Sequence, residues 1–386
     1  MDKIKEKDIK KYIINAQLPR QDSNVRAVIS HLGYIQLDTI HVTERAHHHV
    51  LWTRFPAYKS QMLTDLMAEN KIFEYWSHAA SILPIESFRY SLVRKQNFAW
   101  HNQVTDSAEF KILLIHVYDR ICSEGALSSR DFDDKHRKPR ETWSWKRSRY
   151  ALEYLFQQGK LMVAKRDKFR KVYDLTERVY PQSQQITCPT FQETAEFQVV
   201  KAISTLGAAT AKQIYGYLRF ASSVNVKNVI AEFTSQGKIK PWEYNGKVYY
   251  TTASPTMQEY PEKVFILSPF DNLIINRQRI LDVFDFDYKL ECYLPQAKRK
   301  YGFFSMPLLY QDRFIGLLDA KAERKNKVLM INNLIKITKL SKKEEKLLLS
   351  AIEDFAVFNN CQTIDFNPTR KEQYLYTALF GIKVFP

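Results

Sequence analysis

The sequence predicts an α+β protein with tandem winged-helix (helix-turn-helix) domains followed by a C-terminal β-barrel-like domain. Residues 151–176 and 228–252 share one order of patterns, and helical patterns precede each of them. After about residue 262, short β-type runs replace the helical periodicity. A chain of 386 residues is too long for one core. We expect four domains, with the limits 1–105, 106–182, 183–258 and 259–386.

The two similar segments each run helix, Gln-Gly-Lys, strand, polar turn and strand. Gly159 and Gly237 stand where a helix ends in a left-handed cap. Asn245-Gly246 is a strong hairpin signal, and the turn RDKF takes the same place in the first segment. Two further helical stretches precede each segment. Three helices followed by a hairpin make a winged helix, in which the hairpin is the wing.

The first hundred residues resemble a third, looser copy of this plan. DIKKYIINAQL and SNVRAVISHLG have helical patterns, and a strand containing Gln-Leu-Asp follows them. Linkers rich in proline, glutamine and serine are expected at 179–190 and 251–262.

The C-terminal part contains β-type runs separated by turns, which indicates an open or a closed barrel. These runs are FILSPF, LIINR, YKLECYLP, YGFFSMPLLY, RFIGLLDAK and KVLMINNLI. The following segment, SKKEEKLLLSAIEDFAVF, has an amphipathic helical pattern and is expected to cover the barrel.

The net charge of +16 points to a polyanionic partner, above all nucleic acid. Many soluble proteins are basic without such a role, but here the excess is spread along the chain, as expected for several modules on one long ligand. No run is apolar for long enough to span a bilayer, so no membrane association is expected. The charged start, MDKIKEKDIKKYIINAQLPR, is unlike a signal peptide, and we expect a cytoplasmic protein.

The sequence offers no metal or cofactor motif. The four cysteines stand singly, which argues against a disulfide framework and a CxxC zinc site. The adjacent residues His47, His48 and His49 cannot all face one ion from regular structure, and we expect them to be surface or stacked residues. Gly-rich phosphate loops, GxSxG and kinase motifs are absent. We expect no small-molecule cofactor, and nothing in the sequence indicates an oligomer, so we expect a monomer.

The densest basic patch is KHRKPRETWSWKRSRY, at 135–150, which leads into the expected recognition helix of the second domain. Cationic side chains neutralise phosphates, and the interleaved tryptophans can lie against sugars or bases. The plain alternative is a solvated charged face with two core tryptophans, but its position in the motif favours DNA contact. The candidate DNA-binding residues here are Lys135, Arg137, Lys138, Arg140, Trp143, Trp145, Lys146, Arg147 and Arg149.

A second basic candidate is LPQAKRKYG, at 294–302, between two expected strands of the last domain. Lys298, Arg299 and Lys300 would form the tip of a hairpin that probes a DNA groove. Basic hairpin tips are often only soluble turns, so this signal is weak by itself.

The segment HLGYIQLDTIHV, at 31–42, places an amide and a carboxylate in an apolar strand. Side chains alternate along an extended chain, so Gln36 and Asp38 share one face while Ile35 and Leu37 take the other. Asp38 could be the N-cap of a helix beginning near Thr39, and by itself this segment favours that interpretation. The other interpretation is a small catalytic site.

His78, in the segment EYWSHAA with Trp76, stands among aromatic residues and could face a groove. A half-buried histidine with satisfied hydrogen bonds is the more common outcome for such a position. We keep His78 and Trp76 as candidates for an active-site cleft.

The order of several blocks resembles the YcaQ/AlkZ family of bacterial DNA glycosylases. The blocks extend from about residue 30 to about residue 322 and are SHLGYIQLDTI, VLWTRF, EYWSHAASILP, YDLTERV, LSPFD, DFDYKLECYLP, AKRKYGFFSMPLL and GLLDAK. The resemblance implies tandem winged helices and a β-barrel around duplex DNA. It also implies removal of alkylated purines, especially N7-alkylguanine, in base excision repair, and the unhooking of interstrand crosslinks.

The resemblance assigns catalysis to Gln36-Leu37-Asp38, the Gln-aliphatic-Asp form of the YcaQ-like branch. The Gln-aliphatic-Gln form of the azinomycin-resistance branch is absent, which favours broad excision of cationic N7 lesions. An N7-alkylated purine leaves as a neutral base without an acid. One carboxylate can then stabilise the oxocarbenium-like sugar and activate water, while Gln36 holds that water. No nucleophilic lysine is indicated, so we expect a monofunctional enzyme.

Two other functions remain open at this stage. A non-catalytic winged-helix transcriptional regulator would read a DNA site selectively and would not need Gln36 or Asp38. An RNA- or protein-binding scaffold would bind duplex DNA poorly. Release of free base from alkylated duplex DNA distinguishes the glycosylase from both.

Overall fold

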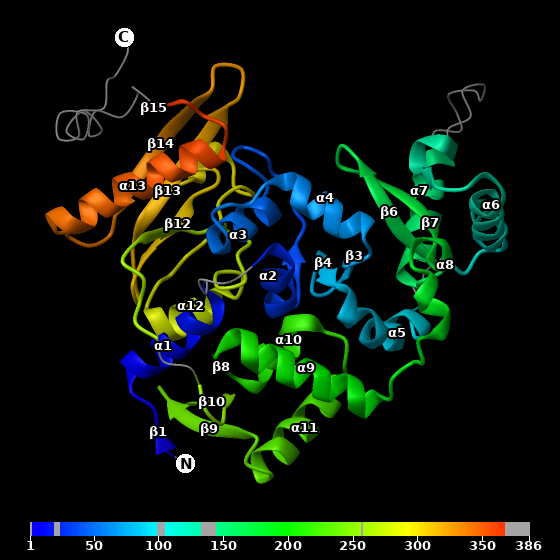
Figure 1. Ribbon diagram of the computed structural model, residues 1–386, viewed down its shortest axis with the longest axis horizontal. Helices are drawn as coiled ribbons and strands as arrows, with labels where there is room; N and C mark the ends of the chain where they lie inside the picture. Colours follow the sequence, from blue (N-terminus) through cyan, green and yellow to red (C-terminus); the bar gives the residue numbers. More distant parts are fainter. Residues whose placement is uncertain (1, 19–23, 99–104, 133–143, 256–257, 367–386) are drawn as a thin grey trace.

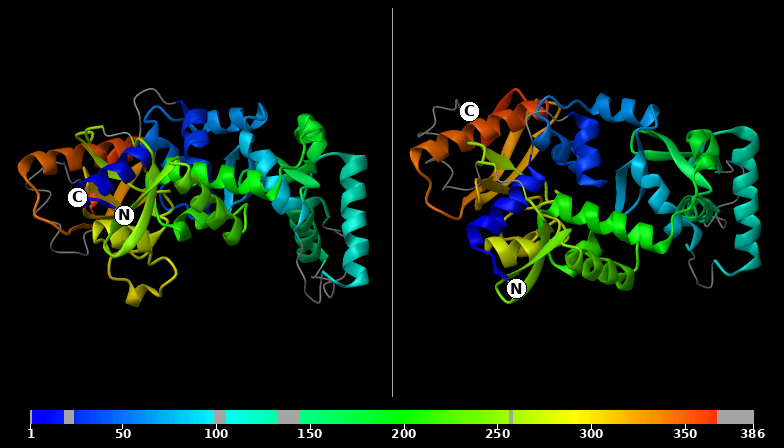
Figure 2. Two further views of the ribbon diagram at one scale, coloured as in Figure 1. Left: turned by 90° about the horizontal axis from the view of Figure 1, so that it is seen from below. Right: turned by 60° about the horizontal axis from the view of Figure 1, so that its bottom comes forward.

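The computed structural model describes residues 2–18, 24–98, 105–132, 144–255 and 258–366 (Figure 1). Helices and strands are mixed along the whole described chain, as expected for the α+β class. The molecule is elongated, with the C-terminal sheet at one end and helix α6 (Ala108–Glu124) at the other (Figure 2).

Three segments have the same element order of helix, short strand, two helices and two strands. In each, the short strand pairs with the last strand, so the sheet orders β2-β4-β3, β5-β7-β6 and β8-β10-β9 are equivalent. The first unit contains α2 (Val25–Leu32), β2 (Ile35–Gln36), α3 (Ala46–Arg54), α4 (Ser60–Ala68), β3 (Ile72–Trp76) and β4 (Ala80–Pro84).

The second unit begins with α6 and places a 3₁₀ helix where the other units have their second helix. It continues with β5 (Leu127–Ser128), η2 (Ser129–Phe132), α7 (Ser144–Gln157), β6 (Leu161–Asp167) and β7 (Arg170–Leu175). The third unit contains α9 (Phe191–Leu206), β8 (Ala208–Ala209), α10 (Ala211–Leu218), α11 (Ser223–Ser235), β9 (Ile239–Tyr244) and β10 (Lys247–Thr252).

The glycine caps predicted for the two similar segments are confirmed. Gly159 follows α7 and Gly237 follows α11, and both have the left-handed backbone that residues with a Cβ adopt only at a cost, with φ of 73° and 68°. Asn245 and Gly246 also have positive φ, which fits the two-residue turn that joins β9 to β10.

The N-terminal helix lies away from the unit to which its pattern was assigned. Strand β1 (Asp2–Lys3) pairs in parallel with β9, and α1 (Glu6–Gln17) packs against α9 and α12 (Arg277–Phe284). A Cβ at Gly207 would lie 2.1 Å from the carbonyl oxygen of Tyr12, so glycine permits this close approach. The apolar face of α1, with Ile9, Ile13 and Ile14, is buried there. The expected domain limits remain predictions.

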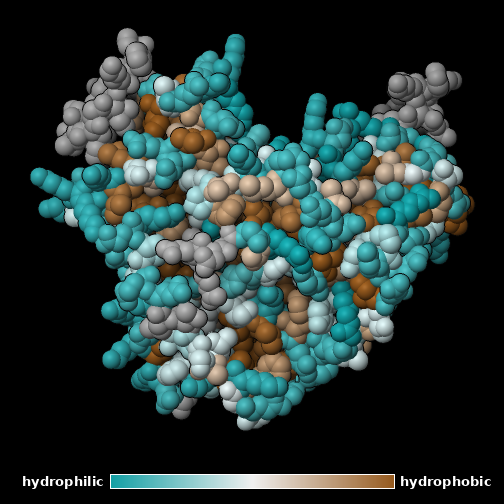
Figure 3. Space-filling model, viewed as in Figure 1, coloured by the Kyte–Doolittle hydropathy of each residue, from teal (hydrophilic) through white to brown (hydrophobic). Residues whose placement is uncertain are grey.

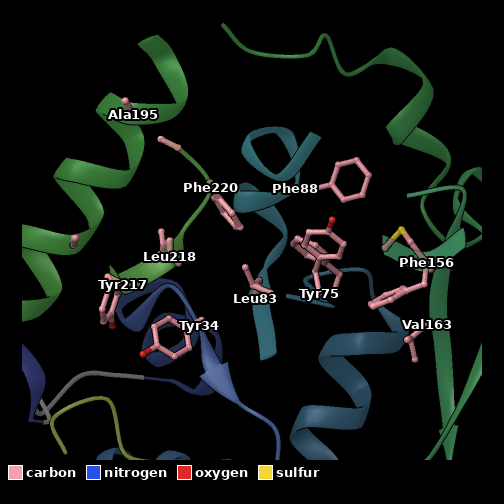
Figure 4. Packing of buried hydrophobic residues seen from close by; sticks show 14 of the residues in the cluster. Tyr34, Tyr75, Leu83, Phe88, Phe156, Val163, Ala195, Tyr217, Leu218 and Phe220 are labelled. Atoms are coloured by element: carbon pink, nitrogen blue, oxygen red, sulfur yellow. The ribbon is translucent and has the colours of Figure 1, made fainter. Parts of the chain in front are cut away.

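One hydrophobic cluster extends through all three units and their connections. Figure 4 shows Tyr34 beside Tyr217, and Tyr75 near Phe88 and Phe156. Because the units share one core, they hold each other in fixed positions. The connecting helices are η1 (Ile85–Ser87), α5 (Phe88–Gln96), α8 (Thr176–Val179) and η4 (Pro181–Gln185).

The C-terminal sheet is a curled, open half-barrel with the order β11-β12-β13-β14-β15, so the closed-barrel alternative is wrong. Strands β11 and β15 form the two edges, and irregularities at Leu308/Leu309 and Asp319/Ala320 interrupt the regular pairing. The strands are β11 (Val264–Ile266), β12 (Met306–Tyr310), β13 (Arg313–Glu323), β14 (Val328–Lys336) and β15 (Thr363–Phe366).

Helix α13 (Lys342–Phe358) covers this sheet, as its pattern predicted. It buries Leu348, Ile352 and Phe355 in the core of the half-barrel and begins with a capping box between Ser341 and Glu344. The expected strands in LIINR and YKLECYLP do not form, because these segments lie in turns and loops on either side of α12.

Lys95 of α5 is a buried cation in the shared core. Its Nζ lies 3.8 Å from the ring centre of Phe88, 4.7 Å from that of Tyr75 and 5.3 Å from that of Phe73. It has no hydrogen-bond partner among the described residues. Burial lowers the pKa of Lys95 to about 7.

We expect Lys95→Met to remove a pH dependence of stability. The pKa of Lys95 lies below its ordinary value of 10.5, so the unfolded chain binds more protons between about pH 7 and 10.5. The free energy of unfolding of the wild type should therefore rise with pH in this range. Lys95→Met should be more stable at pH 6.5, by on the order of 3 kcal/mol, and lose this advantage toward pH 10. Urea unfolding at several pH values measures this, and a difference independent of pH would contradict the assignment.

Candidate active site and nucleic-acid interface

Strand β2 ends at Gln36, and Asp38 lies two residues beyond it in a segment without regular secondary structure. Ile35 is buried and pairs with Ile82, and the backbone N–H of Leu37 donates to the carbonyl of Ala80. Leu37 and Thr39 line a cleft of about 950 Å³ between the first and second units. Gln36 instead contacts His78, which lines a different cavity.

The structure brings His78 to Gln36. His78 Nε2 lies 3.0 Å from Gln36 Oε1, and Ser77 Oγ lies 3.2 Å from His78 Nδ1. Burial, and secondly the charge of Arg219, lower the pKa of His78 to about 4. His78 is therefore neutral near pH 7, and its Nε2–H can donate to Gln36. The amide nitrogen of Gln36 remains available for another acceptor.

Hydrogen bonds from α5 hold the turn that carries His78 in place. Arg94 of α5 donates to the carbonyl oxygens of Trp76 and Ser77, at 3.1 and 2.7 Å. Ser77 also lies within hydrogen-bond distance of Ser81, and the ring of Tyr34 contacts His78 edge-on with centroids 4.9 Å apart. Trp76 faces the other way, since it lines the cleft with Leu37 and Thr39 and is not brought to the catalytic candidates.

Asp38 is half-buried and does not cap a helix. Helix α3 begins at Ala46, so the helix expected near Thr39 is absent. Asp38 Oδ1 accepts a hydrogen bond from the backbone N–H of Ile40 at 2.8 Å, within its own turn. Burial raises the pKa of Asp38, and this hydrogen bond opposes the rise. No described cation forms an ion pair with Asp38.

A loop that sequence reasoning assigned to strands lies beside Asp38. Burial and then the charge of Asp38 raise the pKa of Cys292, and the pKa of Tyr293 is raised by burial, then by Cys292 and then by Asp38, which places both residues near the carboxylate. The side chain of Tyr293 is 78% exposed. Sequence reasoning missed this residue, since nothing local links it to residue 38.

In the same loop, the basic residues that were expected at the tip of a hairpin do not lie in a hairpin. Lys298 ends the 3₁₀ helix η5 (Gln296–Lys298), and Arg299 and Lys300 follow it in the loop between α12 and β12. The carboxylate of Glu291 accepts the N–H groups of Tyr301 and Gly302, which satisfies backbone donors that a strand pair would have used.

Much of the densest basic patch falls outside the described residues: Lys135, Arg137, Lys138, Arg140 and Trp143. Trp145 and Lys146 belong to α7, but their side chains also lie outside that description. Arg147 and Arg149 are exposed on α7, and Arg149 lines the cleft of Leu37 together with Arg130. Their contact with DNA remains a prediction.

Two basic hairpins project on either side of the segment that follows Asp38 (Figure 1). Arg324 at the β13–β14 turn donates to the carbonyls of His41 and Thr43, and the β6–β7 turn places Phe169 under Arg45. Figure 3 shows a hollow between the two projections, whose tips are hydrophilic. Exposed cations at these turns, which sequence reasoning did not select, are Lys168, Arg324, Lys325 and Lys327.

The three adjacent histidines lie on α3 and are not surface residues throughout. His47 and His49 are buried, so the expectation of surface residues is wrong for these two. The expected stacking is present, since the ring centres of His47 and His48 lie 4.1 Å apart. His49 Nε2 contacts the carbonyl of Ile266, and burial lowers the pKa of His48 and of His49 to about 4. Among the described residues, no group of His, Cys, Asp and Glu could hold a metal ion.

A buried ion pair holds the site to the rest of the molecule. Arg54 of α3 donates to both carboxylate oxygens of Asp271, at 2.7 and 2.8 Å. The neighbouring Asn272 donates to the carbonyl of Tyr34 and to the hydroxyl of Tyr217, which in turn donates to the carbonyl of Leu32. The backbone just before Gln36 is thus held by the third unit and the C-terminal part together.

Comparisons with known proteins agree with this architecture. A family model described as DNA glycosylase AlkZ-like matches residues 29–358. A solved structure, the Streptomyces sahachiroi DNA glycosylase AlkZ, is similar with a TM-score of 0.63 and 15% sequence identity, over 95% of this chain and 99% of that chain. In the described part of the chain, all helices are too short or too polar to cross a membrane.

We expect Asp38→Asn to stabilise the fold slightly at neutral pH. Asparagine keeps an oxygen that can accept from Ile40 but removes the half-buried charge. Because the pKa of Asp38 is raised in the folded state, ionisation of this carboxyl destabilises the wild type as the pH rises through its pKa. Urea unfolding should show the advantage of Asp38→Asn at pH 7.5 and its decline toward pH 4.

The exposed Asp65 of α4 provides a matched control, and Asp65→Asn should lack this pH-dependent advantage. Lower stability of Asp38→Asn than of the wild type at pH 7.5 would contradict the prediction.

Proposed function

Because the chain belongs to the AlkZ-like DNA glycosylase family, we propose that it hydrolyses the N-glycosidic bond of N7-alkylated, cationic purines in duplex DNA. The observation that carries the proposal is a pair of partly exposed polar side chains two residues apart, one at the end of β2 and one just beyond it. Gln36 is oriented by a neutral histidine, and Asp38 has no cationic partner among the described residues. A carboxylate with no cationic partner can stabilise positive charge that develops nearby.

In the proposed mechanism, Asp38 acts on the sugar and on water. The alkylated base already carries positive charge and departs neutral, so the reaction needs stabilisation of the oxocarbenium-like sugar and a water at C1′. Asp38 supplies negative charge and accepts the proton of that water. Its raised pKa makes the carboxylate a stronger base than an exposed aspartate.

Gln36 orients the water. Its Oε1 accepts from His78, so its amide N–H groups point to the remaining acceptor, the water or a sugar oxygen. Since the sequence indicates no nucleophilic lysine, we propose a monofunctional enzyme that leaves an abasic site without cleaving the strand.

We interpret the three repeated units as winged helices that contact one duplex. Their common element order and equivalent three-stranded pairings support this interpretation, as does the excess of positive charge. The hollow between the β6–β7 and β13–β14 turns is the proposed DNA surface, since the segment after Asp38 runs between these turns.

The proposal extends to interstrand crosslinks. A crosslinked base remains attached to the opposite strand and cannot swing into a snug pocket, so full base flipping is not required here. The Gln-Leu-Asp form of the motif, which resembles that of the YcaQ-like branch, supports broad excision of N7 lesions.

Asp38→Asn and Gln36→Ala should each lower the excision of N7-methylguanine from duplex DNA, the former by at least about 100-fold. The released free base is measured directly, and abasic sites are counted after cleavage with alkali. Binding to unmodified duplex should stay within about twofold of the wild type, because neither residue is a phosphate contact. Asp65→Asn controls for the loss of one carboxylate from the same unit.

A transcriptional regulator gives the opposite results in this experiment. It would release no base, would discriminate between duplex sequences, and would be unaffected by either substitution. Full excision by Asp38→Asn would remove Asp38 from the mechanism.

His78→Gln should retain more activity than His78→Phe. Glutamine can donate an N–H to Gln36 Oε1, whereas phenylalanine fills the space without a donor. We expect His78→Phe to lower kcat by about tenfold with little change in duplex binding, since one orienting hydrogen bond is lost. Combining His78→Phe with Gln36→Ala should add little to Gln36→Ala alone, and additive effects would separate the two residues.

A further inference from the structure

Arg219 is an exposed cation held in an uncommon backbone conformation. It caps the C-terminus of α10 with φ 59° and ψ 37°, the left-handed region that favours glycine or asparagine. Its guanidinium forms no ion pair or hydrogen bond with the described residues. Strained backbone conformations are concentrated at functional sites, and no contact of the guanidinium with the described residues offsets the strain at Arg219. This combination points to a ligand.

The surroundings of Arg219 are positive. Its charge lowers the pKa of His78 and of Arg94, in each case as a smaller cause than burial. Asp282, which lines the same cavity as Arg219, is engaged in an ion pair with Lys247. Like charges without an anion between them repel each other, and an anionic ligand would relieve that repulsion.

Arg219 and His78 line the same cavity, which has a volume of about 850 Å³. The exposed Lys212 lines it as well, and so does Asn272, whose buried Oδ1 has no partner among the described residues. The cavity therefore offers cationic side chains beside His78, which contacts Gln36. A phosphate with neighbouring hydrogen-bond donors, as in a nucleotide, fits these groups.

We propose that Arg219 binds one backbone phosphate of the DNA strand beside the lesion and so sets the position of that nucleotide at Gln36 and Asp38. This inference rests on the proposed function. A strand carries one phosphate for about every 3.4 Å of helix axis, so a duplex placed on Gln36 brings phosphates to the adjoining cavity. Guanidinium binds phosphate through two parallel hydrogen bonds, which fixes orientation as well as distance.

The test replaces single phosphates of the substrate by neutral methylphosphonates. Duplexes with N7-methylguanine at a fixed site carry one methylphosphonate at each of the flanking positions in turn. With the wild type, one or two positions should weaken binding by about tenfold or more, as for a lost charge-assisted hydrogen bond. With Arg219→Gln, the same positions should have little further effect, and binding of the unmodified duplex should depend less on salt, with a slope lower by about one.

Two further variants separate phosphate binding from folding. Arg219→Gly removes the guanidinium but relieves the left-handed backbone, so it should fold at least as well as the wild type and share the binding defect. Lys227→Gln removes one exposed charge from α11 of the same unit and should retain the wild-type response to each methylphosphonate.

Each outcome is informative. If Arg219→Gln responds to every methylphosphonate as the wild type does, the phosphate assignment is wrong even where excision is intact. If the wild type releases no base from any duplex, the proposed function fails first. Coupling at a defined position in Arg219→Gln and Arg219→Gly, and not in Lys227→Gln, supports the assignment.

Discussion

The buried ion pair between Arg54 and Asp271 is the constraint on which the site depends. Both side chains are almost fully removed from solvent, so each charge is tolerable only because the other is present. Arg54 also donates to the carbonyl of Gln17, which ties α1, the first unit and the C-terminal part at one point. The adjacent Asn272, with Tyr217, holds the carbonyls on either side of Gly33 and so fixes how the chain enters β2.

Because the backbone at Tyr34 is fixed, the alternation of side chains along the extended chain determines where the next three residues point. Ile35 is buried while Gln36 meets His78, and Leu37 turns to the cleft between the first two units. A one-residue slip would exchange these faces and bury the amide. The contact between Gln36 and His78 thus depends on a strand register that distant parts of the chain enforce, and the neutral state of His78 follows from burial at the same junction.

Negative and positive side chains lie at different places on the surface around β2. Asp38 is a carboxylate without a described cationic partner, while cations gather at the β6–β7 and β13–β14 turns and near Arg219. Under the proposed function, these cations would attract DNA through its phosphates, and Asp38 would place negative charge beside the cationic sugar. The proposal therefore assigns affinity and chemistry to different residues, as in DNA-binding proteins whose phosphate contacts position the substrate.

The sequence by itself determined the features that local geometry controls. Gly159 and Gly237 as helix caps, the Asn245-Gly246 turn and the amphipathic α13 all follow from backbone periodicity and sterics. Tertiary structure decided which elements meet. Packing between distant segments brought His78 to Gln36, Tyr293 to Asp38 and α1 to the third unit. The segment LPQAKRKYG forms a loop whose backbone binds the carboxylate of Glu291. Such contacts join residues far apart in the chain, and their free energy comes from buried surface and buried polar pairs that no local pattern encodes.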